Sequence, residues 1–322
     1  MKRLAGETRF EHATDGFGDR YSTVEPLPYN ERYYIILFPF RQEIFNGKTQ
    51  KKEISTMKNK YSLGVIGGGF MARAILSGAI SRGVVKAVDI IVSDVTKESL
   101  DRCSELGVDV ISDNAYVALH CDILLLSVKP QTFSCVNQEL EGISLPPVLS
   151  IMAGKTKRSI QSALNAPCVA RAMPNLPCSI QEGAIGLDVS EFSKENADFV
   201  VKLFSATGKV VEVKESQLNA VTGISGSGSA YVYTFLKALC AAGVEQGLTQ
   251  EQSLALAVQT VKGGVLHVEN NPNLSLDQLI SAVCSKGGTT IAALEQFEKD
   301  DFNGTVSRGV RAAVARAEEL SK

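Results

Sequence analysis

Short apolar runs without polar alternation recur through residues 57–215 of this chain. Such runs, for example residues 63–66 and 122–128, are typical of strands covered on both faces of a parallel sheet. The remaining runs predict strands at residues 89–94, 109–111, 148–152, 168–173, 184–189 and 209–213. Helical spacing separates several of these strands, at residues 71–82, 96–106 and 194–206. This alternation predicts an α/β fold built on a doubly wound sheet.

Helical spacing replaces the strand pattern from about residue 216 onward. We expect helices at residues 229–246, 249–268, 275–284, 289–298 and 302–320. The second of these keeps little polar face, since Leu254, Val258 and Val261 are only some of its apolar residues, so it must be buried. A single helical layer cannot bury it alone. We therefore expect residues 57–215 to form one domain and residues 216–322 to form an all-α dimerisation domain in which two copies of the chain interlock.

Residues 1–56 do not resemble the rest of the chain. An aromatic and apolar stretch, residues 29–40, is interrupted by Pro39 and is too short to span a membrane. Acidic residues such as Glu7 and Asp15 argue against an import signal, so we expect a cytoplasmic protein. Met57 directly precedes the first predicted strand and is suited to be a start. We expect an accessory N-terminal extension that is disordered or adds one strand to the core.

The overall composition excludes several classes of function. A formal net charge of -2 and a pI of about 6.0 leave no electrostatic footprint for nucleic acid. No apolar run reaches the length of a membrane span. Seven cysteines, an odd number without Cys-x-x-Cys spacing, suit a reducing compartment. The histidines lie far apart without metal-ligand spacing, so we expect no metal site.

A glycine-rich segment directly follows the first predicted strand. Gly67, Gly69 and Ala72 occupy the small-residue positions of a Gly-x-Gly-x-x-Ala turn that opens a helix. In a Rossmann-like fold this turn lets the backbone approach a dinucleotide diphosphate at the helix N-terminus. Because ligands of such sheets bind beyond the carboxyl ends of the strands, we expect several strand tails to line one crevice. These tails are Gly67, Gly68, Gly69, Phe70, Met71 and Ala72, then Ser93 and Asp94, then Ser127, Val128, Lys129 and Pro130, then Ala153 and Gly154.

Two further glycine-rich segments lie in the helical half, at residues 223–229 and 285–290. Each precedes a predicted helix, and two interpretations stay open. Both segments can be flexible turns in which glycine supplies positive φ, or each can present successive N–H groups to an anion. A substrate carboxylate suits the second segment, because the hydroxyls of Thr289 and Thr290 lie alongside.

Several segments resemble the signature of pyrroline-5-carboxylate reductases and occur in the same order. They are residues 127–130 (SVKP), 150–154 (SIMAG), 171–175 (RAMPN), 220–231 (AVTGISGSGSAY) and 283–291 (VCSKGGTTI). The resemblance extends from Met57 to the end of the chain. It implies an NAD(P)H-dependent oxidoreductase that acts on a cyclic C=N bond and reduces 1-pyrroline-5-carboxylate to L-proline, the last step of proline biosynthesis. Such a hydride transfer depends on placing donor and acceptor together and needs no side-chain nucleophile.

The resemblance also implies roles for particular residues. Gly287, Gly288, Thr289 and Thr290 would bind the substrate carboxylate, and the catalytic Thr290 hydroxyl would reach the ring nitrogen. Glu215 matches an acidic, catalytic position near the substrate; its other interpretation is a solvated residue before a helix. A second copy of the chain would share the site, and the dimers would assemble into a larger ring. Further cofactor contacts are implied at Ile66, Asn114, Met152 and Asn175.

Some residues depart from the family pattern. Ser229 and Lys286 stand where the family usually has proline, which loosens both loops, and Lys286 either helps to bind substrate or points to solvent. Asp94 stands where NADPH-preferring members tend to carry serine or another small polar residue. An aspartate accepts hydrogen bonds from ribose hydroxyls and repels a 2′-phosphate, so we expect NADH to be used at least as well as NADPH. The alternative is that Asp94 only caps the helix near Thr96. Asn114, near the adenosine ribose, is compatible with either nucleotide.

Two other classes of protein share parts of this pattern. A related imine or β-hydroxyacid reductase would have the same sheet and helices. The hydroxyacid enzymes carry a lysine followed one turn later by asparagine, whereas Lys237 is followed by Cys240 and Ala241. A non-catalytic NAD(P)-binding sensor would keep the fold without turnover, and the intact Gly288 and Thr290 argue against it.

Overall fold

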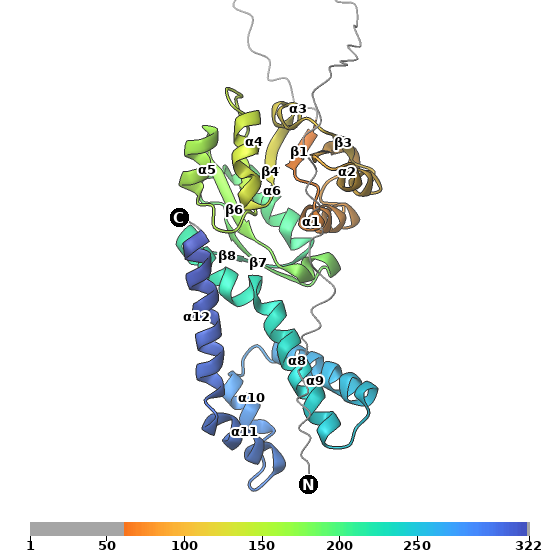
Figure 1. Ribbon diagram of the computed structural model, residues 1–322, viewed down its shortest axis with the longest axis vertical. Helices are drawn as coiled ribbons and strands as arrows, with labels where there is room; N and C mark the ends of the chain where they lie inside the picture. Colours follow the sequence, from red (N-terminus) through yellow and green to blue (C-terminus); the bar gives the residue numbers. More distant parts are fainter. Residues whose placement is uncertain (1–60, 321–322) are drawn as a thin grey trace, which may run out of the picture. The chain divides into compact units, whose positions relative to one another are not determined.

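The computed structural model describes residues 61–320, so the extension predicted at residues 1–56 and the start at Met57 lie outside the described residues. One eight-stranded sheet has the strand order β3-β2-β1-β4-β5-β6-β7-β8 (Figure 1). Its strands are β1 (Tyr61–Ile66), β2 (Ile90–Ser93), β3 (Asp109–Ile111), β4 (Cys121–Leu126), β5 (Val148–Ser150), β6 (Val169–Met173), β7 (Gly183–Asp188) and β8 (Gly208–Glu212).

The sheet is parallel from β3 to β6 and reverses direction once. β6 pairs with β7 in antiparallel register, and β8 is parallel to β7. The connection from β6 to β7, residues 174–182, holds only the 3₁₀ helix Leu176–Ile180. A parallel crossover needs about a dozen residues or more, so this connection is too short for one and the chain turns back. The predicted α/β fold with a doubly wound sheet is confirmed, with a mixed edge that the apolar runs do not reveal.

Helices cover both faces of the sheet. Alternate residues of β1 point to opposite faces: Val65 belongs to one apolar core and Ile66 to the other. The helices of the first face are α1 (Phe70–Ser81), α2 (Lys97–Ser104) and α6 (Lys194–Ser205). Those of the second face are α3 (Asn114–Leu119), α4 (Phe133–Glu139) and α5 (Lys157–Leu164). The sequence pattern predicts no helix at α4 or α5, which are short and bury few residues.

The chain beyond β8 is helical. A 3₁₀ helix, Glu215–Gln217, leads into α7 (Leu218–Val221). Five helices longer than α7 follow: α8 (Gly228–Glu245), α9 (Gln250–Asn270), α10 (Leu276–Ala282), α11 (Thr289–Lys299) and α12 (Phe302–Leu320). Capping boxes begin two of them, because Thr249 and Ser275 accept hydrogen bonds from the backbone N–H groups of Gln252 and Gln278, whose side chains bond back.

The glycine-rich segment at residues 223–229 is not a loop. A π-helical turn, Thr222–Gly226, joins α7 to α8 without a break, so the prediction of an open turn before the helix was wrong. Gly223 serves close packing instead, since a Cβ there would lie 2.6 Å from a methyl group of Val314 in α12. The Ser225 carbonyl accepts a hydrogen bond from Asn175, at 3.1 Å, which ties the turn to the end of β6.

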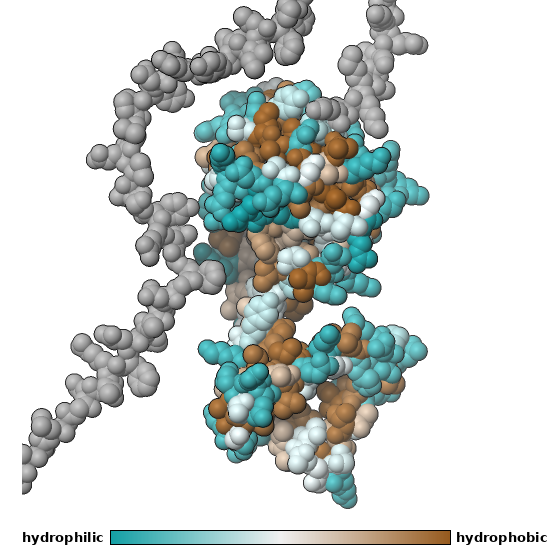
Figure 2. Space-filling model, turned by 90° about the vertical axis from the view of Figure 1, so that its right-hand side faces the viewer, coloured by the Kyte–Doolittle hydropathy of each residue, from teal (hydrophilic) through white to brown (hydrophobic). Residues whose placement is uncertain are grey.

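Large apolar side chains remain exposed along the helical layer (Figure 2). Phe235 is 40% exposed and Leu254 and Leu256 are 48% and 58% exposed. An apolar groove between α8, α9 and α12 is lined by Tyr231, Phe235, Val261, Phe302, Val306 and Val310. Within residues 61–320 no helix is long and apolar enough to cross a membrane. These helices therefore present apolar surface that a single chain does not cover.

Candidate functional site

The glycine-rich turn after β1 is shaped to receive a diphosphate. Gly67 has φ of 97°, and a Cβ there would lie 2.7 Å from the Ser127 carbonyl oxygen, so only glycine fits. Gly69 is the N-cap of α1 and has no side chain to cap the first N–H groups. A Cβ on Gly69 would meet no atom within 4 Å, which means that its surface is open. The first turn of α1 therefore offers free N–H groups and a positive dipole end to an anion.

Four strands end side by side at this turn. Ile66 pairs with Ser93 on one side and with Leu126 on the other, and Leu126 pairs with Ser150. The hydrogen bonding continues into the tails: the Gly67 N–H donates to the Ser93 carbonyl at 2.8 Å, and the Ser127 N–H donates to the Ile66 carbonyl at 2.9 Å. The residues predicted to line the cofactor crevice after β1, β2, β4 and β5 thus lie along one edge of the sheet.

Asp94 makes several contacts at the end of β2. Its Oδ2 accepts a hydrogen bond from the Gly68 N–H at 2.8 Å. Its Oδ1 accepts from the Thr96 N–H and hydroxyl, both at 2.8 Å, at the start of α2. Asp94 therefore supports the helix start without capping it, because the N-cap of α2 is Thr96, whose side chain accepts from the Ser99 N–H. The Asp94 carboxylate also braces the glycine-rich turn.

Asn114 is held between two neighbours at the start of α3. Its Oδ1 accepts from the Ser93 hydroxyl at 2.6 Å, and its amide nitrogen donates to Glu139 Oε2 at 2.5 Å. Glu139 is an exposed residue at the end of α4. Asp94 follows Ser93 in the chain, and Glu139 is linked to Ser93 through Asn114, so two carboxylates lie near the end of this strand. Sequence spacing gives no signal for Glu139.

Two other predicted cofactor residues have inward-facing side chains. Met152 is 2% exposed and belongs to the second apolar core. Asn175 is 8% exposed; besides its bond to Ser225, its Oδ1 accepts from the Ala184 N–H at 2.9 Å. Because the protein itself engages the side chains of Met152 and Asn175, any contact of these residues with a cofactor would be made by their backbone atoms.

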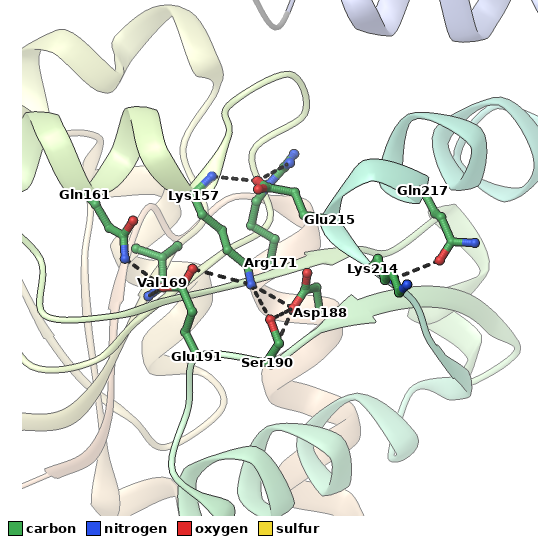
Figure 3. A network of polar contacts seen from close by, with 10 residues as sticks. All are labelled: Lys157, Gln161, Val169, Arg171, Asp188, Ser190, Glu191, Lys214, Glu215 and Gln217. Atoms are coloured by element: carbon green, nitrogen blue, oxygen red, sulfur yellow. Dashed lines mark hydrogen bonds and ion pairs between the residues drawn. The ribbon is translucent and has the colours of Figure 1, made fainter.

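Glu215 belongs to a polar network at the junction of the sheet and the helices (Figure 3). Its Oε1 accepts from the Lys157 N–H at 2.6 Å and from Arg171 Nη1 at 3.1 Å. The Glu215 side chain is 32% exposed and Arg171 is 8% exposed. Glu215 is therefore more than a solvated residue before a helix, because Arg171 in the middle of β6 and Lys157 at the start of α5 both donate to its carboxylate.

A buried ion pair completes this network. Lys157 Nζ lies 2.7 Å from Asp188 Oδ1 and 2.8 Å from the Ser190 hydroxyl, with both charged side chains about one-twentieth exposed. Burial alone would raise the pKa of Asp188, but hydrogen bonds from Lys157 and Ser190 hold it below its usual value. The sequence motifs single out neither Lys157 nor Asp188. Their only signal is that Lys157 falls on the buried face of α5 with Ile160 and Leu164.

The predicted substrate loop forms a second open helix start. Gly288 is the N-cap of α11, and Thr289 and Thr290 are its first two residues. The Gly288 N–H donates to the Ser285 carbonyl at 2.8 Å, which closes the preceding turn. Thr290 is half-buried and Thr289 is exposed. The loop therefore offers amide groups and hydroxyls at a positive dipole end, as the anion-binding interpretation requires.

A single chain does not bring this loop to its own crevice. α11 packs against the start of α12, where Phe297 stacks on Phe302 at 5.6 Å. The far end of α12 reaches the sheet, since a Cβ on Gly154 would lie 2.7 Å from the Leu320 carbonyl oxygen. α12 has 19 residues and is about 28 Å long. Figure 1 accordingly shows α11 well away from the strand tails.

The fold and the open turn together define a class of protein. A sheet of order β3-β2-β1-β4 with a glycine-rich turn at its switch point is the arrangement that binds dinucleotides. Within residues 61–320 no group of three or more His, Cys, Asp or Glu side chains is placed to hold a metal ion. The class is that of nicotinamide-dependent oxidoreductases, in which the bound dinucleotide supplies the hydride chemistry.

Comparison with known proteins identifies the family. Residues 215–320 match the family described as pyrroline-5-carboxylate reductase dimerisation, and residues 62–154 match NADP oxidoreductase coenzyme F420-dependent. A pyrroline-5-carboxylate reductase of Synechocystis sp. is 38% identical over 266 residues, which cover 81% of this chain and 98% of that protein. The chain belongs to the pyrroline-5-carboxylate reductase family, and the resemblance predicted from its sequence is confirmed.

Solved structures agree with this assignment. A pyrroline-5-carboxylate reductase from Coxiella burnetii has a TM-score of 0.74 at 33% identity, covering 82% of this chain and 100% of that one. A Plasmodium falciparum pyrroline carboxylate reductase with NADP bound has a TM-score of 0.73 at 29% identity, covering 83% of this chain and 100% of that one. The α/β fold, the oxidoreductase class and an NADP-binding domain are thereby confirmed.

Proposed function

We propose that this chain reduces 1-pyrroline-5-carboxylate to L-proline with a reduced nicotinamide dinucleotide. One hydride is added to the carbon of the C=N bond and one proton to its nitrogen, so that the imine becomes a secondary amine. The observation that carries the proposal is the pair of uncapped helix starts, at Gly69 and at Gly288, one suited to a diphosphate and the other to a carboxylate. Binding both partners in reactive contact supplies most of the rate.

The substrate end of the site is proposed to lie at residues 287–290. The backbone of Gly287 and Gly288 and the hydroxyl of Thr289 hold the carboxylate, and the Thr290 hydroxyl hydrogen-bonds the ring nitrogen. Neither threonine hydroxyl has a protein partner among the described residues, so both are available to a ligand. Glu215 is proposed as the acidic group near that nitrogen, where a carboxylate favours the protonated and more electrophilic imine.

The site is proposed to form between two copies of the chain. The separation of α11 from the strand tails within one chain requires the loop of one protomer to close over the crevice of its partner. The exposed apolar residues of α8 and α9 supply the surface that holds the two together. In this proposal residues 57–215 bind the dinucleotide, residues 216–322 form the dimer and hold substrate, and dimers assemble further into a ring.

The cofactor is proposed to be NADH at least as readily as NADPH. Asp94 follows Ser93, and Glu139 is linked to Ser93 through Asn114, at the strand end where the adenosine ribose of a dinucleotide bound at the turn would lie. A 2′-phosphate there meets two negative charges, whereas ribose hydroxyls can donate to them. We expect kcat/KM for NADH to equal or exceed that for NADPH; a preference for NADPH of about a hundredfold would overturn this.

We also propose that the protein is located in the cytoplasm. None of the seven cysteines, which all lie within residues 61–320, forms a disulfide, and Cys103, Cys121, Cys178 and Cys240 are buried, as suits a reducing compartment. Burial raises the pKa of the Cys121 thiol to about 12, so this thiol is held in its unreactive protonated form.

Turnover of the cyclic imine tests the proposed function. Purified protein with 1-pyrroline-5-carboxylate should oxidise NADH or NADPH, followed by absorbance, and form proline. Thr290→Ala should lower kcat/KM by about a hundredfold, while the control Thr290→Ser keeps the hydroxyl and most of the activity. Full activity of Thr290→Ala would remove that hydroxyl from the mechanism. Absence of any turnover with either nucleotide would favour the sensor or another reductase.

A further inference from the structure

Arg171 is a buried cation whose partner is the proposed catalytic acid. It lies in β6, with its side chain 8% exposed, and its Nη1 is 3.1 Å from Glu215 Oε1. In register, Arg171 lies opposite Ser150 of β5 and Asp188 of β7. It is therefore anchored on an interior strand, whereas Glu215 lies on the connection between the sheet and the helices.

The neighbouring carboxylates pair with Lys157, so Glu215 is the ion-pair partner of Arg171. Asp188, the acid opposite Arg171, is engaged at 2.7 Å by Lys157, and Glu191 lies on the other side of that lysine at 3.7 Å. Figure 3 shows the contacts of the Lys157 ammonium next to the contacts of Glu215. The Lys157 backbone N–H belongs to the second set, because it donates to Glu215. A buried guanidinium without a carboxylate is strongly unfavourable, so Arg171 fixes where the Glu215 carboxylate must stand.

Both hydrogen bonds to Glu215 reach the same oxygen. Oε1 accepts from Arg171 and from the Lys157 N–H, while Oε2 has no hydrogen-bond partner among the described residues. Two donors on one oxygen fix the orientation of the carboxylate and leave the other oxygen for a ligand. Lys157 lies three residues beyond Gly154 in the chain, and Gly154 belongs to a strand tail predicted to line the cofactor crevice.

We infer that Arg171 is a positioning residue for the reduction: it holds Glu215 so that Oε2 faces the ring nitrogen of the bound imine. This inference rests on the proposed role of Glu215. Arg171 itself touches neither substrate nor cofactor. Lysine in its place keeps the charge but lacks the planar fork that fits the carboxylate, so charge and geometry can be separated.

A double-mutant cycle tests this inference. Arg171→Gln, Arg171→Lys, Glu215→Gln and the double variant Arg171→Gln with Glu215→Gln are compared by kcat and KM for the imine and by the Kd for NADH. Folding is verified by circular dichroism and Tm. Asp188→Asn is the matched control, because it breaks the adjacent buried pair and leaves both hydrogen bonds of Glu215 in place.

Arg171→Gln should lower kcat/KM for the imine by about tenfold and leave the Kd for NADH unchanged. Arg171→Lys should recover part of this loss. The double variant should have a kcat/KM no lower than that of Glu215→Gln. Asp188→Asn should lower Tm and keep kcat/KM within about twofold. Multiplicative losses in the double variant, or an equal loss in Asp188→Asn, would overturn the positioning role. Full activity of Glu215→Gln would instead refute the proposed role of Glu215, and an inactive native protein would refute the reductase itself.

Discussion

The sheet and the helical layer bury their apolar side chains to very different extents. In the sheet and the helices that cover it, Leu63, Leu125 and Phe204 have no exposed surface, and such residues form the cores on both faces. In the helices beyond β8, large residues such as Phe235 and Leu254 stay exposed, and the buried residues of α8 and α9 are Cys240, Ser253 and Ala257, all small. The first region completes its own core, whereas the second needs apolar surface from another molecule.

This difference has a consequence for function. The turn that suits the diphosphate belongs to the region that is complete in one chain. The loop that suits the carboxylate belongs to the region that is not. We therefore expect nucleotide binding to depend little on assembly and imine reduction to depend on it almost entirely.

The largest effect is expected from a charge on the exposed face of α9. Leu254→Glu places a carboxylate in the proposed dimer surface, where it has no partner, and should yield monomers that lose turnover by about a hundredfold or more. Light scattering after size exclusion gives the mass, and fluorescence titration should show nearly unchanged NADH binding. Val88→Glu is the control, since Val88 is 69% exposed beside β2 in the complete region. A dimeric, active Leu254→Glu would contradict the comparison.

The second-largest effect is expected on the stability of the sheet and the helices that cover it. Asp188→Asn removes the closer anion of the buried Lys157 ammonium and leaves only Glu191, at 3.7 Å, so it should lower the free energy of unfolding by about 3–5 kcal/mol, measured by denaturant titration at neutral pH. The folded-state pKa of Asp188 is lowered, so its contribution is present above the unfolded-state pKa of about 3.9 and is lost as pH falls through the folded-state value. The difference between the native protein and Asp188→Asn should therefore shrink below about pH 4. A difference that is constant with pH would exclude the ion pair as its cause.

The smallest effect is expected at the adenosine end of the crevice. Asp94→Ser removes one of the two carboxylates beside Ser93 and should shift the ratio of kcat/KM for NADPH over NADH upward by about tenfold. Asp101→Ser, on the exposed side of α2, changes the net charge equally and should leave the ratio unchanged. An identical ratio in Asp94→Ser and the native protein would mean that Asp94 only braces the turn.

Sequence reasoning succeeded where local pattern decides the structure. The β1 strand, the Gly67–Ala72 turn and helix α9 follow from apolar runs, glycine spacing and helical spacing. It failed where distant contacts decide. The reversal at β7, the π-helical turn at Thr222–Gly226 and the Lys157–Asp188 pair each depend on which segments meet in space. The position of Lys157 on the apolar face of α5 does not reveal which acid it meets.

Complementation between two inactive chains tests the central claim most directly. One chain carries Gly67→Val, which blocks the diphosphate turn, and the other carries Thr290→Ala, which disables the substrate loop; they are co-expressed with different tags. If each site takes its turn from one protomer and its loop from the other, mixed dimers contain one intact site, and an equal mixture should recover about a quarter of native activity. Mixed dimers that are isolated by both tags and remain as inactive as either parent would contradict the shared site.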